Sequence, residues 1–338
     1  TSESDGDDQG DTDDANDTAD SGGVDDTGDT SRDTGVPPDT TPNDTSVDTT
    51  PIDTTPVDTT PAQPVQVKIA TFNTHLFFDT VCDSGSCTSS DFEEQLTPET
   101  FESKVSTLAN AINRLDADIV LLQEVEKSDC LEALQAHLSA PYEVSRMGES
   151  GGTASIDTAV LSRGRLIGTF THKNTPIYEQ DGTRTYFARE LLEVHVDING
   201  APVIVFAAHF KSKANPDEPE RRWAEARATR QIMETVAAAN PTSLIVMGGD
   251  LNDTPDSAPL QELMSTSSLE RVAADLSGAA SYTYYYNGDG QVIDHIFRAV
   301  TGGGRYVPGT SVVFRDGTSG FGGSDHASVR ATFEITPP

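Results

Sequence analysis

A carboxylate and an amide, Asp250 and Asn252, lie two residues apart directly after a run of four apolar residues at 244–247. Such a run is typical of a strand that is buried on both faces. The two glycines that follow the run allow a sharp turn and the close approach of a ligand. At the end of a buried strand, the two side chains could contact a phosphate or a water molecule. The alternative is a simple Asx turn, because Asp and Asn are also frequent turn formers.

The same pattern, a polar side chain at the end of an apolar strand, recurs along the chain. The residues that share it are Asn73, Glu124, His209, Asp250, Asn252, Asp294, Asp325 and His326. This repetition predicts a single site assembled from several strand ends.

The residue types in this set indicate a cation site. Three carboxylates from different strands, Glu124, Asp250 and Asp325, are accompanied by the amides of Asn73 and Asn252. Oxygen ligands suit Mg²⁺, Mn²⁺ or Ca²⁺ rather than Zn²⁺. We therefore expect a divalent cation here, with Mg²⁺ as the first choice.

Two histidines, His209 and His326, each have a candidate carboxylate partner that would fix the imidazole tautomer and raise its basicity. A cation and an Asp–His pair together fit hydrolysis of a phosphate ester. The base deprotonates water, and the cation neutralises charge on the phosphoryl oxygens. The alternative is that Ser324-Asp325-His326 forms only a polar turn, with no catalytic role. We expect His295, next to an apolar strand, to be a structural histidine.

Apolar periodicity indicates the elements that must position these side chains. A strand at 65–73, a helix that begins at Thr97-Pro98 and a strand at 119–124 predict a βαβ-like unit. Asn199-Gly200 favours a hairpin turn between strands at 186–196 and 203–209. The remaining expected elements are helices at 131–138, 220–239 and 260–264, and strands at 158–162, 291–297 and 327–335.

The helix at 220–239 carries four arginines that we expect to point mostly outward: Arg221, Arg222, Arg227 and Arg230. They could form a solvated face or contact phosphates. Together with Lys211 and Lys213, Arg221 and Arg222 would suit a track for a polyanion.

Residues 1–64 differ in composition from the rest of the chain. They hold 18 acidic residues and one basic residue, with a near-repeat of Pro-x-Asp-Thr-Thr and almost no large apolar side chains. Such a segment cannot bury enough surface to offset its ordering entropy. We expect a disordered, self-repelling stalk at 1–64 and one domain at 65–338. A binding arm is the alternative.

Residues 65–338 hold 37 acidic and 21 basic residues and so carry a formal net charge of −16. This charge argues against loose binding of polyanions through bulk attraction. It does not exclude a nucleic-acid enzyme that uses cations and a local basic patch.

The chain has three cysteines, of which Cys82 and Cys87 could close a short loop by a disulfide, while Cys130 would remain free. Two cysteines without a third nearby ligand make a poor zinc site. The stalk and the disulfide favour a secreted or cell-surface location. No apolar run reaches membrane-spanning length, the polar start at Thr1 is not a signal peptide, and nothing implies a stable protein partner, so we expect a monomer.

Seven short motifs occur in an order that resembles the endonuclease/exonuclease/phosphatase superfamily. They are Thr71-Phe72-Asn73, Gln123-Glu124-Val125, Phe187-Ala188-Arg189-Glu190, Ala208-His209, Gly249-Asp250-Leu251-Asn252, Ile293-Asp294-His295-Ile296 and Ser324-Asp325-His326. The match spans residues 65–336. Arg189-Glu190, His209 and the segment 209–213 are similar to the DNase I-like branch, and particularly to secreted bacterial nucleases.

This resemblance implies an α/β fold, a four-layer sandwich of two packed β-sheets flanked by helices, with the site at one edge. It implies that Glu124 binds the cation with Asn73 and Asp325 nearby, and that Asp250 and Asn252 position the water or the phosphate. By the same match Asp294 orients His326, Asp157 orients His209, and Arg189 contacts a phosphate. The cysteine-bearing loop after Asn73 and the acidic surface depart from the family pattern and leave the substrate open.

The sequence thus favours a secreted, Mg²⁺-dependent nuclease that hydrolyses phosphodiester bonds in DNA, with RNA as a second substrate and Lys211 among the substrate-binding residues. The first alternative is a phosphodiesterase or phosphatase of the same fold that acts on a lipid or a small phosphate ester. The second is a surface-displayed binding module without turnover. An exposed apolar rim around the site would favour a lipid. The sequence shows no long apolar insertion of that kind.

Overall fold

Two β-sheets packed face to face form the centre of the molecule. The computed structural model describes residues 63–88, 90–214 and 216–338, which fall within one compact unit. The predicted stalk at 1–64 lies outside the described residues except for Gln63 and Pro64. Within the described residues, no helix combines the length and the apolar character needed to cross a membrane.

The first sheet is built around the long strand β1. Its strands, in spatial order, are β15 (Arg305–Tyr306), β17 (Ser328–Ile335), β1 (Val65–Phe77), β2 (Ile119–Val125), β4 (Asp157–Ser162) and β3 (Val144–Gly148), with β16 (Val312–Phe314) also paired to β17. β1 pairs in parallel with β2 through the helix α1 (Pro98–Leu115), which confirms the predicted βαβ unit. The hydroxyl of Thr97 accepts a hydrogen bond from the backbone N–H of Thr100 and so caps α1 as expected.

The second sheet is built around β10, the strand of Asp250. Its strands, in spatial order, are β11 (Leu269–Val272), β14 (Asp294–Ala299), β10 (Leu244–Asp250), β9 (Ala201–His209), β8 (Leu192–Ile198) and β5 (Arg165–Thr171). Two small hairpins, β6 (Ile177–Tyr178) with β7 (Arg184–Thr185) and β12 (Tyr284–Tyr286) with β13 (Asp289–Gln291), lie outside both sheets. A short 3₁₀ turn covers Gly278–Ala280.

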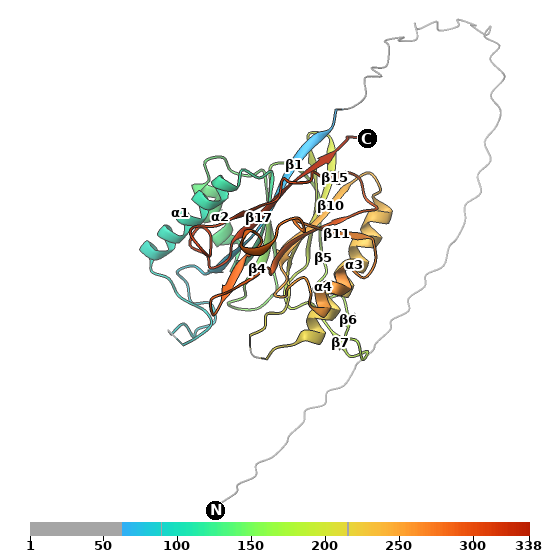
Figure 1. Cartoon of the computed structure of the whole chain (residues 1–338). Helices are drawn as coiled ribbons and strands as arrows, with labels where there is room; N and C mark the ends of the chain where they lie inside the picture. Colours follow the sequence, from blue (N-terminus) through green and yellow to red (C-terminus); the bar gives the residue numbers. More distant parts are fainter. Residues whose placement is uncertain (1–62, 89, 215) are drawn as a thin grey trace, which may run out of the picture. The chain divides into compact units, whose positions relative to one another are not determined.

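Alternate residues of the central strands enter different apolar layers, because successive side chains of a strand point to opposite faces. Ile69 joins the core between the sheets, whereas Ala70 joins the core beneath α1 and α2 (Ser128–His137). In the second sheet, Val246 faces the first sheet and Met247 faces α3 (Pro219–Ala239) and α4 (Ala258–Leu263). Figure 1 shows the helix pairs on opposite sides of the sheets. The predicted four-layer sandwich is confirmed.

One predicted strand is shorter than expected. The hairpin turn at Asn199-Gly200 is present with both residues at positive φ, but β8 begins only at Leu192. Before it, the backbone is bonded to side chains: the N–H of Ala188 donates to Glu225, and the carbonyl of Glu190 accepts from Thr158. These bonds replace the partners that a strand would supply, so this segment is a loop.

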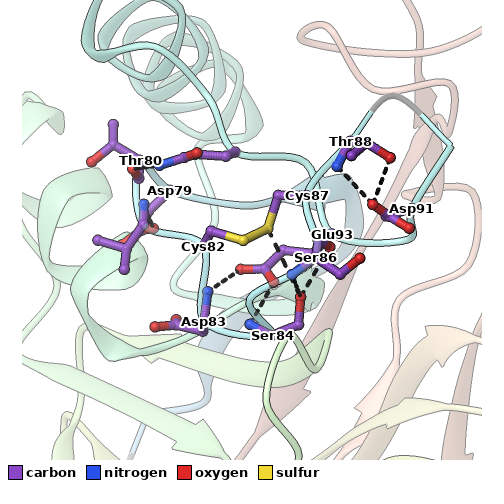
Figure 2. Close-up of a disulfide and its surroundings, with 12 residues drawn as sticks. Asp79, Thr80, Cys82, Asp83, Ser84, Ser86, Cys87, Thr88, Asp91 and Glu93 are labelled. Atoms are coloured by element: carbon purple, nitrogen blue, oxygen red, sulfur yellow. Dashed lines mark hydrogen bonds between the residues drawn. A yellow bond between two sulfur atoms is a disulfide. The ribbon is translucent and has the colours of Figure 1, made fainter.

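The cysteine-bearing loop after β1 is closed by the expected Cys82–Cys87 disulfide. Glu93, at the other end of the loop, accepts hydrogen bonds from the backbone N–H groups of Asp83 and Ser84 at 2.6 and 2.8 Å (Figure 2). Cys130 is free and buried in α2, also as expected.

Candidate active site

The two sheets meet in one hydrogen bond system at the ends of β1, β2 and β10. The Nδ2 group of Asn73, on β1, donates to Oε1 of Glu124 and to Oδ2 of Asp250, at 3.0 Å in each case. Glu124 belongs to the first sheet and Asp250 to the second. The predicted convergence of strand ends therefore occurs, with Asn73 as the bridge.

The backbone around these carboxylates adopts left-handed conformations that non-glycine residues seldom take. His75, Leu76, Glu124 and Asn252 have φ values of 53°, 46°, 62° and 53°. Such conformations cost about 1–3 kcal/mol each and cluster at functional sites. Lys104 of α1 compensates by donating to the carbonyls of His75 and Leu76 at 2.7 Å.

Gly249 is required by the close packing of β10 on β9. A Cβ atom at this position would lie 1.9 Å from the carbonyl oxygen of Ala208, so no other residue fits without moving the strands. This close pairing places Asp250 opposite His209 in the parallel register.

His326 is held by a carboxylate at the start of β14, in the other sheet. Its Nδ1 lies 2.9 Å from Oδ2 of Asp294, and its Nε2 lies 3.7 Å from Oδ2 of Asp250. The ring of Tyr284 packs against it at 4.8 Å. Burial acts to lower the pKa of His326, but the carboxylates of Asp294 and Asp250 outweigh it and raise that pKa to about 10. The predicted Asp294–His326 pair is present.

His209 lies on the other side of Asp250 in a different environment. Its Nε2 is 3.8 Å from Oδ2 of Asp250 and 3.9 Å from Oε1 of Glu124. Burial, followed by the positive charges of Arg189 and His326, lowers its pKa well below the usual value. His209 is therefore neutral where His326 is charged.

The predicted pairing of Asp157 with His209 is wrong. Asp157 accepts hydrogen bonds from the backbone N–H of Ser150 and the hydroxyl of Ser155. The buried Nδ1 of His209 has no hydrogen-bond partner among the described residues. Asp157 instead fixes the loop between β3 and β4.

Asp325 lies at the outer edge of the site and pairs with a residue to which the sequence assigned no role. Its Oδ1 is 3.0 Å from Nδ1 of His75, and both side chains are about half exposed. The hydrogen bond to Asp325 raises the pKa of His75. No feature of the sequence distinguishes His75 from a surface histidine. The feature that does so is its positive φ, which cannot be read from residue types.

Asn252 and Arg189 share one acceptor. Nδ2 of Asn252 and Nη1 of Arg189 both donate to the carbonyl oxygen of Phe210, at 3.1 and 3.2 Å. Arg189 thus lies beside the carboxylate cluster. Lys211, the next residue after Phe210, directs its Nζ toward the carbonyls of Ser212 and Pro216.

The expected outward orientation is wrong for Arg222. Its side chain is buried and bonded to Asp253 at 2.9 Å and to Asp217 at 2.7 Å. Lys213 also pairs with Asp253, at 2.8 Å. Arg222 is therefore not part of the polyanion track predicted from the sequence. Lys213 could contribute to that track only if its ion pair with Asp253 opened.

His295 has the structural role expected of it. It is buried, its Nε2 lies 2.9 Å from the carbonyl oxygen of Asp253, and burial lowers its pKa to about 4. It therefore stays neutral and holds the segment after Asp250 in place.

The residues present fit a divalent cation. Glu124, His209 and Asp250 each offer a ligand atom, and these atoms lie within 4.8 Å of one another. Burial raises the pKa of Asp250 to about 7 although the charge of His326 lowers it, so this carboxylate remains under-compensated and would gain from a bound cation. Oδ1 of Asn73 is less available as a cation ligand, because this atom already accepts a hydrogen bond from the N–H of His75.

Comparison with known proteins agrees with this geometry. The model of the endonuclease/exonuclease/phosphatase family matches residues 70–326, most of the chain. The chain belongs to this family. No curated protein matches the sequence.

Solved structures of the endonuclease/exonuclease/phosphatase fold are similar at low identity. A protein from Bacteroides vulgatus that carries the family name is 19% identical, with 80% of this chain and 99% of that chain covered and a TM-score of 0.55. TDP2 from C. elegans is 17% identical, with 79% and 75% covered and a TM-score of 0.55. D. rerio TDP2 complexed with single strand DNA product is 16% identical, with 79% and 98% covered and a TM-score of 0.52.

Membership of the endonuclease/exonuclease/phosphatase family makes the protein a metal-dependent phosphodiester hydrolase. The cluster of Glu124, His209 and Asp250 is where its residues would hold the divalent cation. A bound cation supplies charge neutralisation on phosphoryl oxygens in the transition state.

Proposed function

We propose that this protein is a secreted nuclease that hydrolyses phosphodiester bonds in DNA, and secondarily in RNA, with Mg²⁺ as its cation. The observation that carries the proposal is the position of Arg189. Arg189 donates to the carbonyl of Phe210, which also accepts from Asn252 beside the carboxylate and histidine cluster. Arg189 also lines a cavity together with other basic side chains. A strand of nucleic acid presents phosphates on both sides of the scissile bond, so it can use both the cluster and the neighbouring cations.

The two histidines, whose Nε2 atoms lie 3.8 and 3.7 Å from Oδ2 of Asp250, support attack of water on a phosphate bound at the cluster. The Asp250 carboxylate would be neutralised by a cation that it holds. The pKa of His326 would then fall, because that carboxylate is one of the charges that raise it. His326 can then accept a proton from water at Nε2 while Asp294 stabilises the resulting imidazolium at Nδ1. His209 is neutral and shares the cluster with Glu124 and Asp250, so its role would be to hold the cation or bind the scissile group rather than to donate a proton.

The disulfide supports the proposed location. Structural disulfides persist in oxidising compartments and are rare in the cytosol, and Cys82–Cys87 closes a loop at the surface. Mg²⁺ is proposed over Ca²⁺ because few protein oxygens converge, and Mg²⁺ is usually bound through one or two carboxylates with several waters; Mn²⁺ is the alternative that the assay compares.

The test is a cleavage assay on supercoiled plasmid, linear duplex DNA, single-stranded DNA and RNA. Each is incubated in EDTA and then with Mg²⁺, Mn²⁺ or Ca²⁺ restored, with His326→Ala as the inactive control. Bis(p-nitrophenyl) phosphate and phospholipid vesicles are run in parallel. Metal-dependent cleavage of nucleic acid supports the proposal. Turnover of lipid or of the small diester alone would replace it with the alternative phosphodiesterase, and turnover of nothing would favour a binding module.

A further inference from the structure

A cavity of about 390 Å³ adjoins the candidate active site and carries an excess of positive charge. Four basic side chains line it: Lys173, Arg189, Lys211 and Arg221. They come from separate parts of the chain: the segment after β5, the loop before β8, the end of β9 and the start of α3. Convergence of four cations is unusual in a chain segment whose net charge is −16.

These cations are poorly neutralised within the protein. Among the ion pairs of the described residues, Lys173 and Arg189 have no carboxylate partner, and Lys211 and Arg221 share Glu218 at 3.9 and 3.4 Å. Burial lowers the pKa of Lys173, and the charges of Arg221 and Arg189 act in the same direction. Together they outweigh the carboxylates of Asp157 and Glu190, which raise that pKa. The group is therefore short of negative charge, which an anionic ligand would supply.

The wall of the same cavity includes an aromatic ring from the disulfide loop. Phe92 lines the cavity and is 58% exposed. It meets the buried ring of Phe78 edge-on at 5.7 Å, which fixes its position and leaves ring surface accessible to solvent. An exposed aromatic ring beside several cations is a common arrangement in sites that bind single-stranded nucleic acid.

Hydrogen bonds hold Phe92 in place through the loop that carries it. Its neighbour Glu93 is bonded to the backbone of Asp83 and Ser84 inside the disulfide ring (Figure 2). Leu96 donates to the carbonyl of Asp79 at 2.9 Å and closes the base of the loop. A ring held in this way loses little further conformational entropy when a ligand stacks on it.

We propose that this cavity is a subsite for an unpaired nucleotide that flanks the scissile bond, with its phosphate among the four basic side chains and its base stacked on Phe92. The subsite rests on the proposed nuclease function. A base can stack on Phe92 only when its face is free, which requires a single strand or an opened duplex. The cavity therefore makes single-stranded nucleic acid the better substrate.

The first test compares Phe92→Ala and Phe92→Trp with a matched control, Phe170→Ala. Phe170 is 51% exposed on β5 and does not line this cavity. Steady-state kinetics are measured on a single-stranded oligonucleotide, on its duplex and on bis(p-nitrophenyl) phosphate. Phe92→Ala should lower kcat/KM on the single strand by about 5- to 150-fold, mainly through KM, as expected for loss of one stacked base. The loss on the small diester should be several-fold smaller, and Phe92→Trp should restore the single-strand value.

The outcomes separate the subsite from the function. If the wild-type protein cleaves oligonucleotides and Phe92→Ala behaves like Phe170→Ala, the subsite is wrong and the nuclease function stands. An equal loss on all three substrates would also overturn it, because Phe92 would then act on the fold or the catalytic cluster. If the wild-type protein turns over only the small diester, the nuclease function fails and the subsite fails with it.

The second test addresses the basic side chains. Lys173→Gln is compared with a control, Lys68→Gln. Lys68 is an exposed lysine on β1 that pairs with Asp116. Binding of a labelled single strand is measured in EDTA by fluorescence anisotropy at several salt concentrations. Loss of one phosphate contact should reduce the slope of log Kd against log salt by about 0.7 in Lys173→Gln only. Equal slopes in the two variants would contradict the phosphate half of the proposal.

Discussion

Glu225 is a buried carboxylate outside the catalytic cluster, yet it organises the residues that face the substrate. Its two oxygens accept hydrogen bonds from the backbone N–H groups of Ala188 and Lys211, at 2.7 and 2.8 Å. One donor precedes Arg189 and the other belongs to Lys211 itself. Glu225 therefore fixes from α3 the two segments that carry Arg189 and Lys211, and we regard it as a positioning residue for the proposed subsite.

The stability of the protein should decline with pH through the titration of Glu225. Burial outweighs the two hydrogen bonds and raises its pKa from the usual 4.5 to about 6. The folded state thus holds this proton more tightly than the unfolded state. The contribution is complete below pH 4.5 and is lost as pH rises through 6, to the extent of about 2 kcal/mol.

Chemical denaturation of the wild-type protein and Glu225→Gln between pH 4 and 7 measures this effect. The difference in unfolding free energy between the two should shrink by about 2 kcal/mol over that range. Glu220→Gln, an exposed position on the same helix, is the control. A difference that stays constant with pH would show that folding leaves the pKa of Glu225 unchanged.

His326 and His295 provide a matched pair for testing the catalytic assignment, since both are buried histidines near Asp294. His326→Ala should lower kcat by about 10²- to 10⁴-fold, the usual contribution of a general base. His295→Ala should retain most turnover, because the ring of His295 bonds to the backbone of Asp253 and packs near Phe297 without joining the carboxylate cluster. Circular dichroism must first confirm that both variants fold. An inactive His295→Ala beside an active His326→Ala would mean that the site is wrongly assigned.

At the scale of residues, the sequence predicted the convergence but not all the partners. Asn73, Glu124 and Asp250 could be predicted because each follows the apolar run of its strand, although β1 continues past Asn73 to Phe77 after an irregularity in its pairing with β2. The partner of His209 could not, because the direction of Asp157 depends on the loop at 150–155, where no periodicity operates. Arg222 was misplaced for a similar reason: a buried arginine is identified only by its carboxylates, and Asp253 is distant in sequence.

At the scale of elements, the loop between β1 and α1 combines a disulfide with a folded surface segment. The ring from Cys82 to Cys87 supplies two of the N–H groups that hold Glu93. Lys127 adds ion pairs to Asp79 and Asp83, at 2.9 and 2.5 Å. The loop is thus ordered at both ends although it has no regular secondary structure.

Replacing both cysteines, Cys82→Ser with Cys87→Ser, should lower the free energy of unfolding by about 2 kcal/mol, since so short a ring gives limited chain-entropy stabilisation. Thermal or urea unfolding measures the loss. Mass analysis after alkylation without reductant should find both thiols protected in secreted material. Two free thiols in that material would remove the support for an oxidising location.

Elements with a strong apolar period were predicted, and those without one were missed. β2, β9 and β10 contain long apolar runs that are buried on both faces, and β1 alternates before it becomes buried on both faces. β5 is an edge strand with mostly exposed or half-buried residues, and the hairpin strands β6 and β7 are two residues long. Such strands are specified by their neighbours rather than by their own composition.

At the scale of the whole molecule, catalysis depends on the packing of two sheets that each carry part of the site. Glu124 comes from one sheet and Asp250 from the other, and the core between them includes Leu121 of β2 and Val246 of β10. Any change that shifts the sheets relative to each other would separate the two carboxylates. The affinity for the cation should therefore be linked to global stability.

The last prediction concerns this linkage. A cation that binds only the folded protein stabilises it by about 2.7 kcal/mol at a concentration of 100 times Kd. For a domain of this size, each kcal/mol raises Tm by about 2–4 °C. Mg²⁺ should therefore raise Tm by about 5–10 °C over the value in EDTA. The physical reason is relief of the unfavourable burial of Asp250 beside Glu124.

Calorimetry of Asp250→Asn and Asp289→Asn, with and without Mg²⁺, tests the location of this effect. Asp289 is exposed on β13, away from the cluster, so Asp289→Asn should show the full Mg²⁺-dependent rise. Asp250→Asn should show little or none, because one of the two carboxylates has lost its charge. An equal rise in both variants would place the stabilising cation elsewhere in the protein. The same titration with Mn²⁺ and Ca²⁺ ranks the three cations by affinity at the site, independently of any measurement of turnover.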